Sequence, residues 1–501
     1  MSDDSYLNLT PNPLSLIESL RDIGYSMDTA MADIVDNCIT ANARQIWIRF
    51  SWNSGFPCLA IIDNGNGMSR ETLRNAMRFG SMSPLETRSP NDLGRFGLGM
   101  KTASLSQCRH LTVVSQQAGE ISGFEWDLDR LAADEPFEWR IGEIDTENIT
   151  QDHKLSALYN QYLSKGSSGT VVLWQSFDRI DKQESSREAT FNALMTDARH
   201  HLELVFHRFL TPFPGKKRLL VYMNGDPLLP FDPFNTHNPT TTELPEQRFS
   251  LNGQPIVIRP YILPHHSKVS KEEYEKYAGD VGYLHNQGFY LYRNRRLIIK
   301  GTWFRLIKKE ELNKLLRIRV DIPNTLDHLW KIDIKKSDAT PPESIRKEFR
   351  QVIGRIQIAG KNVFEQRGSK LTSLTKTPVW NRRATQGRIS YQINREHPLF
   401  TKLLEILSVE QKSILHDLIA TIESSFPVDT FYHDAAVEPE HLANPNIEEA
   451  HLEQILCLFL DLWKAKGLSD NEVVENIQST DPFASHRELT GKILQDRGYV
   501  L

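Results

Sequence analysis

The sequence predicts an α/β protein, and three observations at its start support this. An amphipathic helix pattern covers residues 26–40, two strand patterns follow at 45–50 and 58–62, and two glycine-rich motifs stand next to predicted elements. Further along, strand patterns return between residues 287 and 335, and helical periodicity dominates after residue 391. Mixed helices and strands followed by a helical region predict an α/β protein with a mainly helical C-terminal part.

The predicted helix begins at Ser26, a preferred N-cap residue. Its apolar residues form one face, and the opposite stripe holds Asp33, Asp36, Asn37 and Thr40. An amide oxygen suits Mg²⁺, and a carboxylate one turn away can polarise a water molecule. We therefore interpret Asn37 as a metal ligand and Asp33 as a general base. The alternative is an ordinary solvated helix face.

The second strand pattern, at 58–62, is almost wholly apolar and ends at Asp63, which opens the motif D-N-G-N-G-M. A carboxylate at the end of a buried strand can accept a hydrogen bond from an adenine amino group. Gly65 and Gly67 would let the backbone turn sharply and approach the base closely. A plain turn has the same composition, so this motif alone leaves both interpretations open.

A Ser/Pro/Asn-rich stretch at 80–92 leads to the motif G-R-F-G-L-G-M-K at 94–101, and a helix is predicted at 100–107. Free amide groups and the helix dipole make such a junction an anion site. Lys101 adds a positive charge. The alternatives are a flexible loop with a glycine hinge or a dinucleotide fingerprint, but the alternating strands and helices of a Rossmann domain do not follow.

In this order and spacing, the three motifs resemble the GHKL superfamily of ATPases, which includes type II topoisomerases, heat-shock chaperones of that group, histidine kinases, MutL and MORC proteins. The resemblance implies a Bergerat α/β sandwich that binds ATP and Mg²⁺, with Asn37 as the metal ligand. A glycine-threonine step at Gly169 resembles the superfamily's, in which the hydroxyl, here of Thr170, supports the adenine-binding aspartate. The other implied ATP-binding residues are Asp63, Gly65, Gly67, Met68, Gly94, Arg95, Phe96, Gly97, Leu98, Gly99, Met100 and Lys101.

One residue departs from the superfamily pattern. The general base is usually Glu, and the matching residue here is Asp33. The side chain is shorter by one methylene, and a displacement of about 1 Å can cost on the order of a hundredfold in rate. We therefore expect slow hydrolysis. In the family pattern, Asp36 supports the fold and the water network of the site.

Residues 287–300, Q-G-F-Y-L-Y-R-N-R-R-L-I-I-K, predict two strands around a turn at Arg293, and further strands are predicted at 317–323 and 330–335. This region resembles the transducer domain of MORC and MutL proteins, in which a lysine reaches the γ-phosphate. Lys335 and Lys336 are the candidates, and the alternative is that both are simply solvated. The domain order does not fit a histidine kinase.

Composition predicts a cytoplasmic protein of about three domains. The 501 residues are 39% hydrophobic, and no apolar run approaches the length of a membrane span. The four cysteines show no metal-binding spacing, so we expect them to be reduced. Residues 1–5 are acidic, so no signal peptide is expected.

Charge is unevenly distributed. Residues 282–390 hold 24 Lys and Arg against nine Asp and Glu, whereas residues 391–501 hold eight against 19. The basic region could neutralise DNA phosphates without reading sequence. The alternative is a mixed solvated surface in which some arginines pair with the acidic region. The candidate DNA-binding residues are Lys308, Lys309, Lys314, Arg317, Arg382 and Arg383.

These observations predict four segments: an ATPase domain with an N-terminal strap at 1–185, a transducer domain at 186–365, a basic linker or arm at 366–390 and a helical domain at 391–501. The last contains neither a nuclease motif nor a zinc cluster. By resemblance we expect an ATPase that dimerises on ATP, with residues 6–25 packing on the partner, and acts on DNA as a clamp or motor component. A bacterial restriction or anti-phage module with nuclease or helicase partners is the expected setting. The alternative is a chaperone-like switch that binds client proteins.

Overall fold

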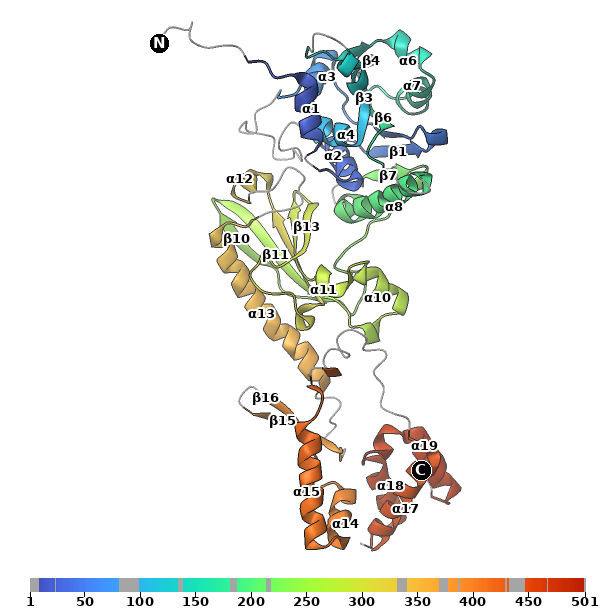
Figure 1. The fold of residues 1–501 in the computed structure, drawn as a ribbon, viewed down its shortest axis with the longest axis vertical. Helices are drawn as coiled ribbons and strands as arrows, with labels where there is room; N and C mark the ends of the chain where they lie inside the picture. Colours follow the sequence, from blue (N-terminus) through green and yellow to red (C-terminus); the bar gives the residue numbers. More distant parts are fainter. Residues whose placement is uncertain are drawn as a thin grey trace. The chain divides into compact units, whose positions relative to one another are not determined.

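The computed structural model separates the chain into two units, Met1–Gly360 and Lys361–Leu501. The first unit contains two sheets, and the second contains a hairpin and several helices (Figure 1). The structure describes residues 9–22, 24–80, 99–133, 138–180, 187–212, 218–330, 340–368, 377–385, 388–428, 430–431, 447–465 and 467–499.

The first unit holds two domains, each built around one of its two sheets. An eight-stranded sheet in the order β5-β4-β3-β6-β2-β1-β7-β8 forms the centre of the first domain. β1 and β7 are parallel, and the other neighbours are antiparallel. The sheet therefore continues past residue 185, at which the first domain was expected to end. Its strands are β1 (Gln45–Ser51), β2 (Cys58–Asp63), β3 (Cys108–Gln117), β4 (Glu120–Asp127), β5 (Gly142–Ile144), β6 (Gly169–Phe177), β7 (Leu220–Met223) and β8 (Asp226–Pro227).

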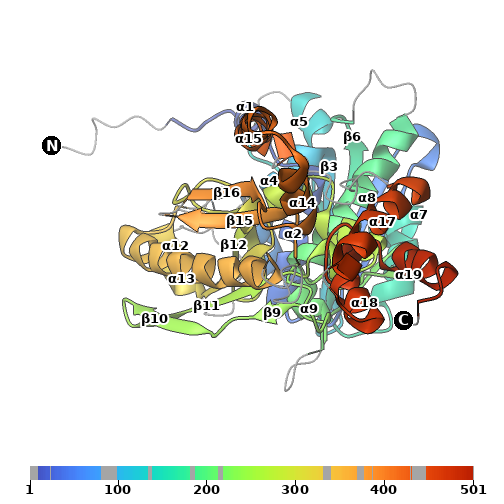
Figure 2. The same cartoon turned by 90° about the horizontal axis from the view of Figure 1, so that it is seen from below.

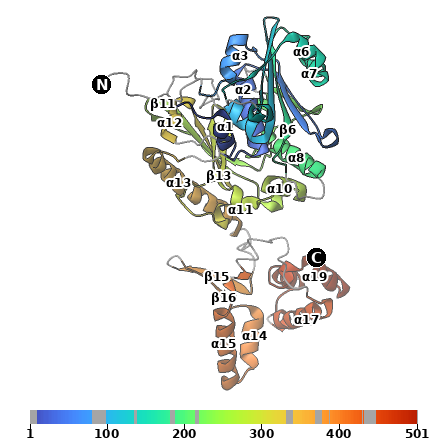
Figure 3. The same cartoon turned by 45° about the horizontal axis from the view of Figure 1, so that its top comes forward.

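Helices cover both faces of this sheet (Figure 3). Successive side chains of a strand point to opposite faces, so Leu59 and Ile61 of β2 join one core cluster and Ala60 and Ile62 join the other. Burial on both faces explains the continuous apolar run of β2. The first cluster includes residues of α1 (Pro13–Arg21), α2 (Met27–Thr40), α3 (Arg70–Met77), α4 (Gly99–Gln107) and α8 (Arg187–Val205), and the second those of α6 (Thr146–Gln151) and α7 (His153–Leu158).

A second sheet follows, in the order β10-β11-β14-β12-β13, with β9 paired to β11. The helix α13 (Glu343–Gly368) lies along this sheet in Figure 1, and its Phe349 stacks on Phe289 with ring centroids 4.1 Å apart. β12 and β13 confirm the two strands predicted within 287–300. The strands are β9 (Thr242–Glu243), β10 (Gln247–Leu251), β11 (Gln254–Ile262), β12 (Gly288–Arg293), β13 (Arg296–Thr302) and β14 (Leu316–Ile322).

The strand predicted at residues 330–335 is contradicted at Trp330, its first residue. Trp330 is the last residue of the short helix α12 (Asp327–Trp330), and its buried ring lies near those of Phe304 and Phe349. The alternation W-K-I-D-I suggested a strand, but aromatic packing holds Trp330 at the end of a helical turn. Residues 331–339 lie outside the described part of the chain.

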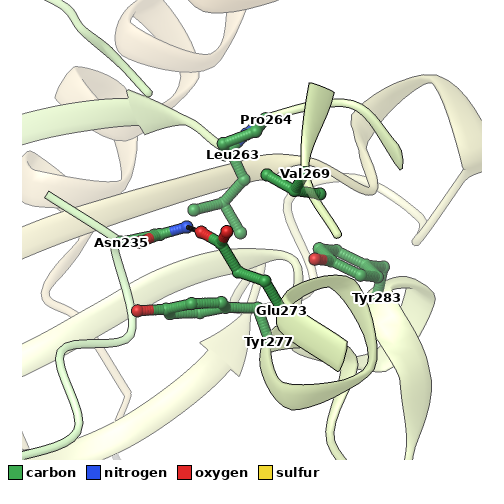
Figure 4. Close-up of a pocket in the computed structure, with 7 residues that line it drawn as sticks. All are labelled: Asn235, Leu263, Pro264, Val269, Glu273, Tyr277 and Tyr283. Carbon is green, nitrogen blue, oxygen red and sulfur yellow. Dashed lines mark hydrogen bonds between the residues drawn. The ribbon is translucent and has the colours of Figure 1, made fainter. Parts of the chain in front are cut away.

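A small pocket in the second domain contains a hydrogen bond between two of its lining residues, Asn235 and Glu273 (Figure 4). Glu273, on α10 (Lys271–Ala278), accepts hydrogen bonds from the amides of Asn235 at 2.8 Å and Asn238 at 2.7 Å. These bonds tie α10 to the loop before β9. We assign this cluster a structural role.

The second unit begins its described part with the hairpin β15 (Trp380–Thr385) and β16 (Arg388–Ile393), whose strands lie side by side in Figure 2. β15 thus occupies part of the stretch expected to be a linker. Five α-helices with described bounds follow the hairpin, and α17 and α18 agree with the helices predicted there. The helices are α14 (Pro398–Ile406), α15 (Val409–Ser424), α17 (Glu449–Ala465), α18 (Asp470–Gln478) and α19 (Arg487–Asp496).

Two surface properties bear on function. Within the described ranges, no helix combines the length and the hydropathy that crossing a lipid bilayer requires. On α15, a row of apolar side chains is exposed, with exposed fractions of 62% for Ile414, 54% for Leu418 and 41% for Ile422. These residues recur every four positions, so they lie on one face of the helix.

Candidate functional site

Polar side chains on three neighbouring strands lie together at one edge of the first sheet. Asp63 of β2 continues the row of Leu59 and Ile61, so it faces the same side as α2. It is in register with Thr170 of β6, which is in register with Ser115 of β3. The Ser115 and Thr170 hydroxyls are 2.9 Å apart. The three strands therefore bring one carboxylate and two hydroxyl groups next to each other on the same face of the sheet.

Asp63 is nearly fully buried, with 4% of its surface exposed. Burial raises the pKa of Asp63 to about 6, although hydrogen bonds from the Gly65 N–H and the Cys38 thiol lower it. The Gly65 bond is 2.7 Å long. Cys38 belongs to α2, so its thiol connects the helix to the strand end. Such a carboxylate can accept a hydrogen bond from a ligand amino group.

The turn after Asp63 requires glycine for reasons of space. A Cβ on Gly65 would lie 2.6 Å from the Ala41 carbonyl oxygen at the end of α2. Gly67 has φ +65°, and a Cβ there would lie 1.9 Å from the Gln116 carbonyl oxygen. The turn is also bound to its surroundings, because Met68 N–H donates to Ser115 Oγ at 2.9 Å. The motif thus packs directly against α2 and β3.

The two carboxylates and the amide on the polar stripe of α2 differ in exposure and in their partners. Asp33 is 4% exposed, and the Tyr25 hydroxyl donates to its Oδ2 at 2.9 Å. Asp36 is 1% exposed and forms an ion pair with Arg296. Asn37 is exposed. The helix therefore offers one amide to solvent beside two buried carboxylates.

The helix α4 begins at Gly99, close to Asp33. An added Cβ on Gly99 would lie 3.4 Å from Asp33 Oδ2, so the start of α4 borders the carboxylate. Met100 is half-buried. Lys101 is buried and donates from Nζ to the Ala76 carbonyl at 2.6 Å, and burial lowers the pKa of Lys101 to about 8. The structure thus places the Lys101 cation against the end of α3. Gly94, Arg95, Phe96, Gly97 and Leu98 lie outside the described residues.

The order along the chain of α2, the strand end at Asp63 and the start of α4 is that of a known family. Residues 25–170 match the family described as "Histidine kinase-, DNA gyrase B-, and HSP90-like ATPase". This part of the chain is a GHKL ATPase domain. The match covers α2, β2 and α4 in full and ends at Thr170, the second residue of β6.

Two MORC proteins resemble parts of the chain. The mouse (Mus musculus) protein "MORC family CW-type zinc finger protein 3" is 34% identical over 79 residues, which cover 15% of this chain and 8% of that protein. The Caenorhabditis elegans protein "ATPase morc-1" is 32% identical over 94 residues, which cover 19% of this chain and 11% of that protein. The chain therefore aligns with about a tenth of each relative's length.

The GHKL domain offers donors that fit a hard cation bound together with phosphate. Among the residues that the structure describes, no group of three or more His, Cys, Asp or Glu side chains could hold a metal ion alone. Mg²⁺ is commonly held by one or two protein oxygens plus substrate phosphates. Asn37 supplies such an oxygen from an exposed position on α2.

The predicted DNA-binding residues differ in accessibility. Lys308 and Lys309 are exposed, and Lys309 donates to the His285 carbonyl. Lys314 pairs with Glu311 at 3.0 Å. Arg317 is 2% exposed and donates to two carbonyl groups, so it cannot reach a phosphate at the surface. The side chains of Arg382 and Arg383, and all of Lys335 and Lys336, lie outside the described part.

Sequence reasoning missed three residues of this region. Ser115 could have been noticed as a lone small hydroxyl in line with the buried Leu111 and Val113 of its strand. Tyr25 directly precedes the N-cap residue, which gives no signal of contact with Asp33. Arg296 stands in the R-N-R-R turn, and nothing in the sequence connects it with α2.

Proposed function

We propose that the chain binds Mg²⁺-ATP at the edge of the first sheet and hydrolyses it slowly. The observation that supports this most is the convergence of α2 with the end of β2. Asn66 N–H donates to the Ala41 carbonyl at the end of α2 at 2.8 Å, and the Cys38 thiol of α2 interacts with the Asp63 carboxylate. These contacts bring the proposed adenine acceptor, Asp63, to the helix that carries Asp33 and Asn37.

Each residue has a distinct proposed role. Asp63 accepts a hydrogen bond from the adenine amino group, and Thr170 and Ser115 support the strand ends beside it. Asn37 would hold Mg²⁺ together with phosphate oxygens. Asp33 would take a proton from the attacking water, and the Tyr25 hydroxyl fixes its carboxylate. The amides at the start of α4 would face the phosphates, with residues 94–98 as the lid.

An assay on purified protein tests this proposal. We expect phosphate release from Mg²⁺-ATP by the wild-type protein and none above background by Asp33→Asn, which should still bind ATP. Asn37→Ala should lose most Mg²⁺-dependent affinity while keeping the weaker affinity for nucleotide in EDTA. Wild-type turnover in Asp33→Asn would remove Asp33 from the role of base.

We further propose that ATP drives dimerisation and that the protein acts on DNA as a clamp or motor component. The positive charge between residues 282 and 390 and the local similarity to MORC proteins support contact with DNA. A cytoplasmic bacterial restriction or anti-phage module, with a nuclease or helicase partner, is the proposed setting. Stimulation of ATPase activity by DNA would support the proposal, and salt-insensitive turnover with no DNA binding would oppose it.

A second candidate function is an ATP-dependent switch that binds client proteins. The exposed apolar row of Ile414, Leu418 and Ile422 on α15 favours it, because such a row can bind apolar segments of unfolded chains. The protein would then suppress the aggregation of an unfolded model substrate, and Ile414→Ser with Leu418→Ser would abolish this effect. Strong DNA binding without any suppression would exclude this candidate.

A further inference from the structure

The link between α1 and α2 carries the side chain that contacts the proposed base. Tyr25 lies in this link, outside regular secondary structure, and its hydroxyl donates to Asp33 Oδ2 at 2.9 Å. Only 7% of Tyr25 and 4% of Asp33 is exposed, so little water can compete for this hydrogen bond. The preceding Gly24 has a φ of 85°, which glycine adopts without strain. The orientation of the Asp33 carboxylate therefore depends on what holds the Tyr25 backbone.

The last residue of α4 holds that backbone. Gln107 donates from Nε2 to the Tyr25 carbonyl at 2.9 Å and to Ser106 Oγ at 2.8 Å, and these bonds use both donors of its amide nitrogen. A main-chain carbonyl only accepts hydrogen bonds, so the nitrogen of the amide faces Tyr25. The Ser106 hydroxyl gives its own proton to the Ala103 carbonyl at 2.6 Å, which leaves its oxygen to accept from Gln107. Two partners thus fix one orientation of the buried Gln107 amide.

The other end of the link is attached to the same turn of α4. Arg21, the last residue of α1, is 2% exposed and donates from Nε to the Leu105 carbonyl at 2.6 Å. Arg21 before the link and Tyr25 at its end are therefore both bound to the last three residues of α4. At its start, the same helix borders Asp33 through Gly99. One helix thus contacts the proposed base directly at one end and through Tyr25 at the other.

We propose that Gln107 is a positioning residue for ATP hydrolysis: it holds the Tyr25 backbone, and the Tyr25 hydroxyl then orients the Asp33 carboxylate. The inference rests on the proposed function, in which Asp33 is the base. Gln107 stands at the opposite end of α4 from Gly99, about 12 Å along the axis at a rise of about 1.5 Å per residue. Only the start of α4 is proposed to face the phosphates. Loss of the Gln107 amide should therefore slow the chemical step and leave nucleotide binding unchanged.

Steady-state kinetics of the full chain test this with Gln107→Met, which keeps the length of the side chain and removes its donors. We expect kcat to fall about fivefold, while KM for Mg²⁺-ATP and Kd for Mg²⁺-ADP stay within about twofold. Gln287→Met is the matched control. Gln287 is a fully buried glutamine of the second domain, and its Nε2 also donates to two main-chain carbonyls. The control variant should keep the wild-type kcat.

A double variant shows whether Gln107 acts through Tyr25. Tyr25→Phe removes the hydroxyl that contacts Asp33, so adding Gln107→Met should lower kcat no further. A further fall by the same factor as in the single variant would mean that Gln107 acts by another route, and the inference would be wrong. It would also be wrong if Gln107→Met alone kept the wild-type kcat. If Gln107→Met does not fold, Gln107→Asn replaces it, because its amide is one methylene too short to reach the carbonyl.

Hydrogen–deuterium exchange without nucleotide gives a readout that does not depend on hydrolysis. Loss of the Gln107 bond should speed exchange severalfold in peptides that contain Tyr25, relative to the wild type and to Gln287→Met. Unchanged exchange in these peptides would overturn the inference, because Gln107 would then not hold the link. A wild-type protein that releases no phosphate, although exchange changes as expected, would instead overturn the proposed function.

Discussion

Asp33 is a carboxylate whose direction is set by a neighbour outside its own helix. The Tyr25 hydroxyl donates to Oδ2, and a Cβ added to Gly99 at the start of α4 would lie 3.4 Å from the same oxygen, at ordinary van der Waals contact. A shorter side chain than the usual Glu can still hold a water molecule if its orientation is fixed. Tyr25 is the residue that provides this orientation.

We predict that Tyr25→Phe lowers kcat about fivefold and leaves KM for ATP nearly unchanged. The change removes one hydrogen bond to the proposed base, worth about 1 kcal/mol, and no nucleotide contact. Steady-state kinetics measure both constants. A control is Tyr162→Phe, whose ring lies near Trp47 on the other face of the sheet. An increase in KM with unchanged kcat would show that Tyr25 acts on binding instead.

Asp63 gives a prediction about pH. Because its pKa is raised to about 6 in the folded chain, above the unfolded value of about 3.9, the folded state binds the extra proton between these values. The protonated Asp63 carboxyl stabilises the folded state, and this stabilisation is fully present below the unfolded pKa. It is lost as pH rises through the folded pKa of about 6. The loss is about 3 kcal/mol in total.

The wild-type protein should therefore lose stability relative to Asp63→Asn as pH rises from about 4 to about 6, since Asn does not titrate. Thermal unfolding of both proteins without nucleotide, across this range, measures the difference in Tm. A difference that does not vary with pH would mean that Asp63 has an ordinary pKa in the folded protein.

At the scale of elements, the turn between β2 and α3 is where close packing most restricts the sequence. Gly67 and Gly119 both have positive φ, of +65° and +88°. A Cβ on Gly119 meets nothing within 4 Å, whereas one on Gly67 meets the Gln116 carbonyl. Comparing the two glycines therefore separates the cost of backbone strain, which both share, from the cost of a steric clash, which only Gly67 has.

Gly119→Ala should cost about 1 kcal/mol from its backbone conformation alone. Gly67→Ala should cost clearly more and should also weaken ATP binding, because the turn must move away from β3. Thermal unfolding and nucleotide titration of both variants measure these effects. Equal costs would show that the turn moves aside freely.

Much at this scale could be predicted from the sequence. The helix α2, the strands β1 and β2 and the start of α4 agree with the predictions within one or two residues, because periodicity and glycine turns are local signals. Ser26 stands at the predicted N-cap, although its side chain makes no capping bond. Trp330 was wrongly predicted, since tertiary aromatic contacts outweighed a short alternating pattern. The partners of Asp33 and Asp36 could not be predicted, because a local pattern carries no information on distant contacts.

At the scale of the molecule, the exposed lysines of the second domain give a prediction about DNA. Lys308→Glu with Lys309→Glu should weaken binding to every DNA sequence alike and reduce the dependence of affinity on salt. Lys402→Glu with Lys464→Glu makes the same charge change on exposed residues of the acidic region and is the control. Fluorescence anisotropy at several salt concentrations measures both. An unchanged salt slope in the first variant would place the DNA site elsewhere.

Oligomeric state gives the last prediction. In this structure α1 packs on its own domain, where Arg21 donates to the Leu105 carbonyl at 2.6 Å and to Asp178 at 2.5 Å. The helix α1 therefore has a partner within the chain, and any crossing of α1 to a second subunit on ATP must release these contacts. We expect light scattering to show a doubled mass with a non-hydrolysable ATP analogue and not with ADP. The same mass in both would argue against a nucleotide-gated clamp.

The Asp36–Arg296 pair also has a consequence for how this protein can diverge. A buried acid and a buried base from separate domains cannot be replaced independently, because either one alone leaves an uncompensated charge. Positions 36 and 296 should therefore covary among proteins that share both domains. For the same reason, a chimera that joins this first domain to a foreign second domain should need a guanidinium at the start of the strand that matches β13.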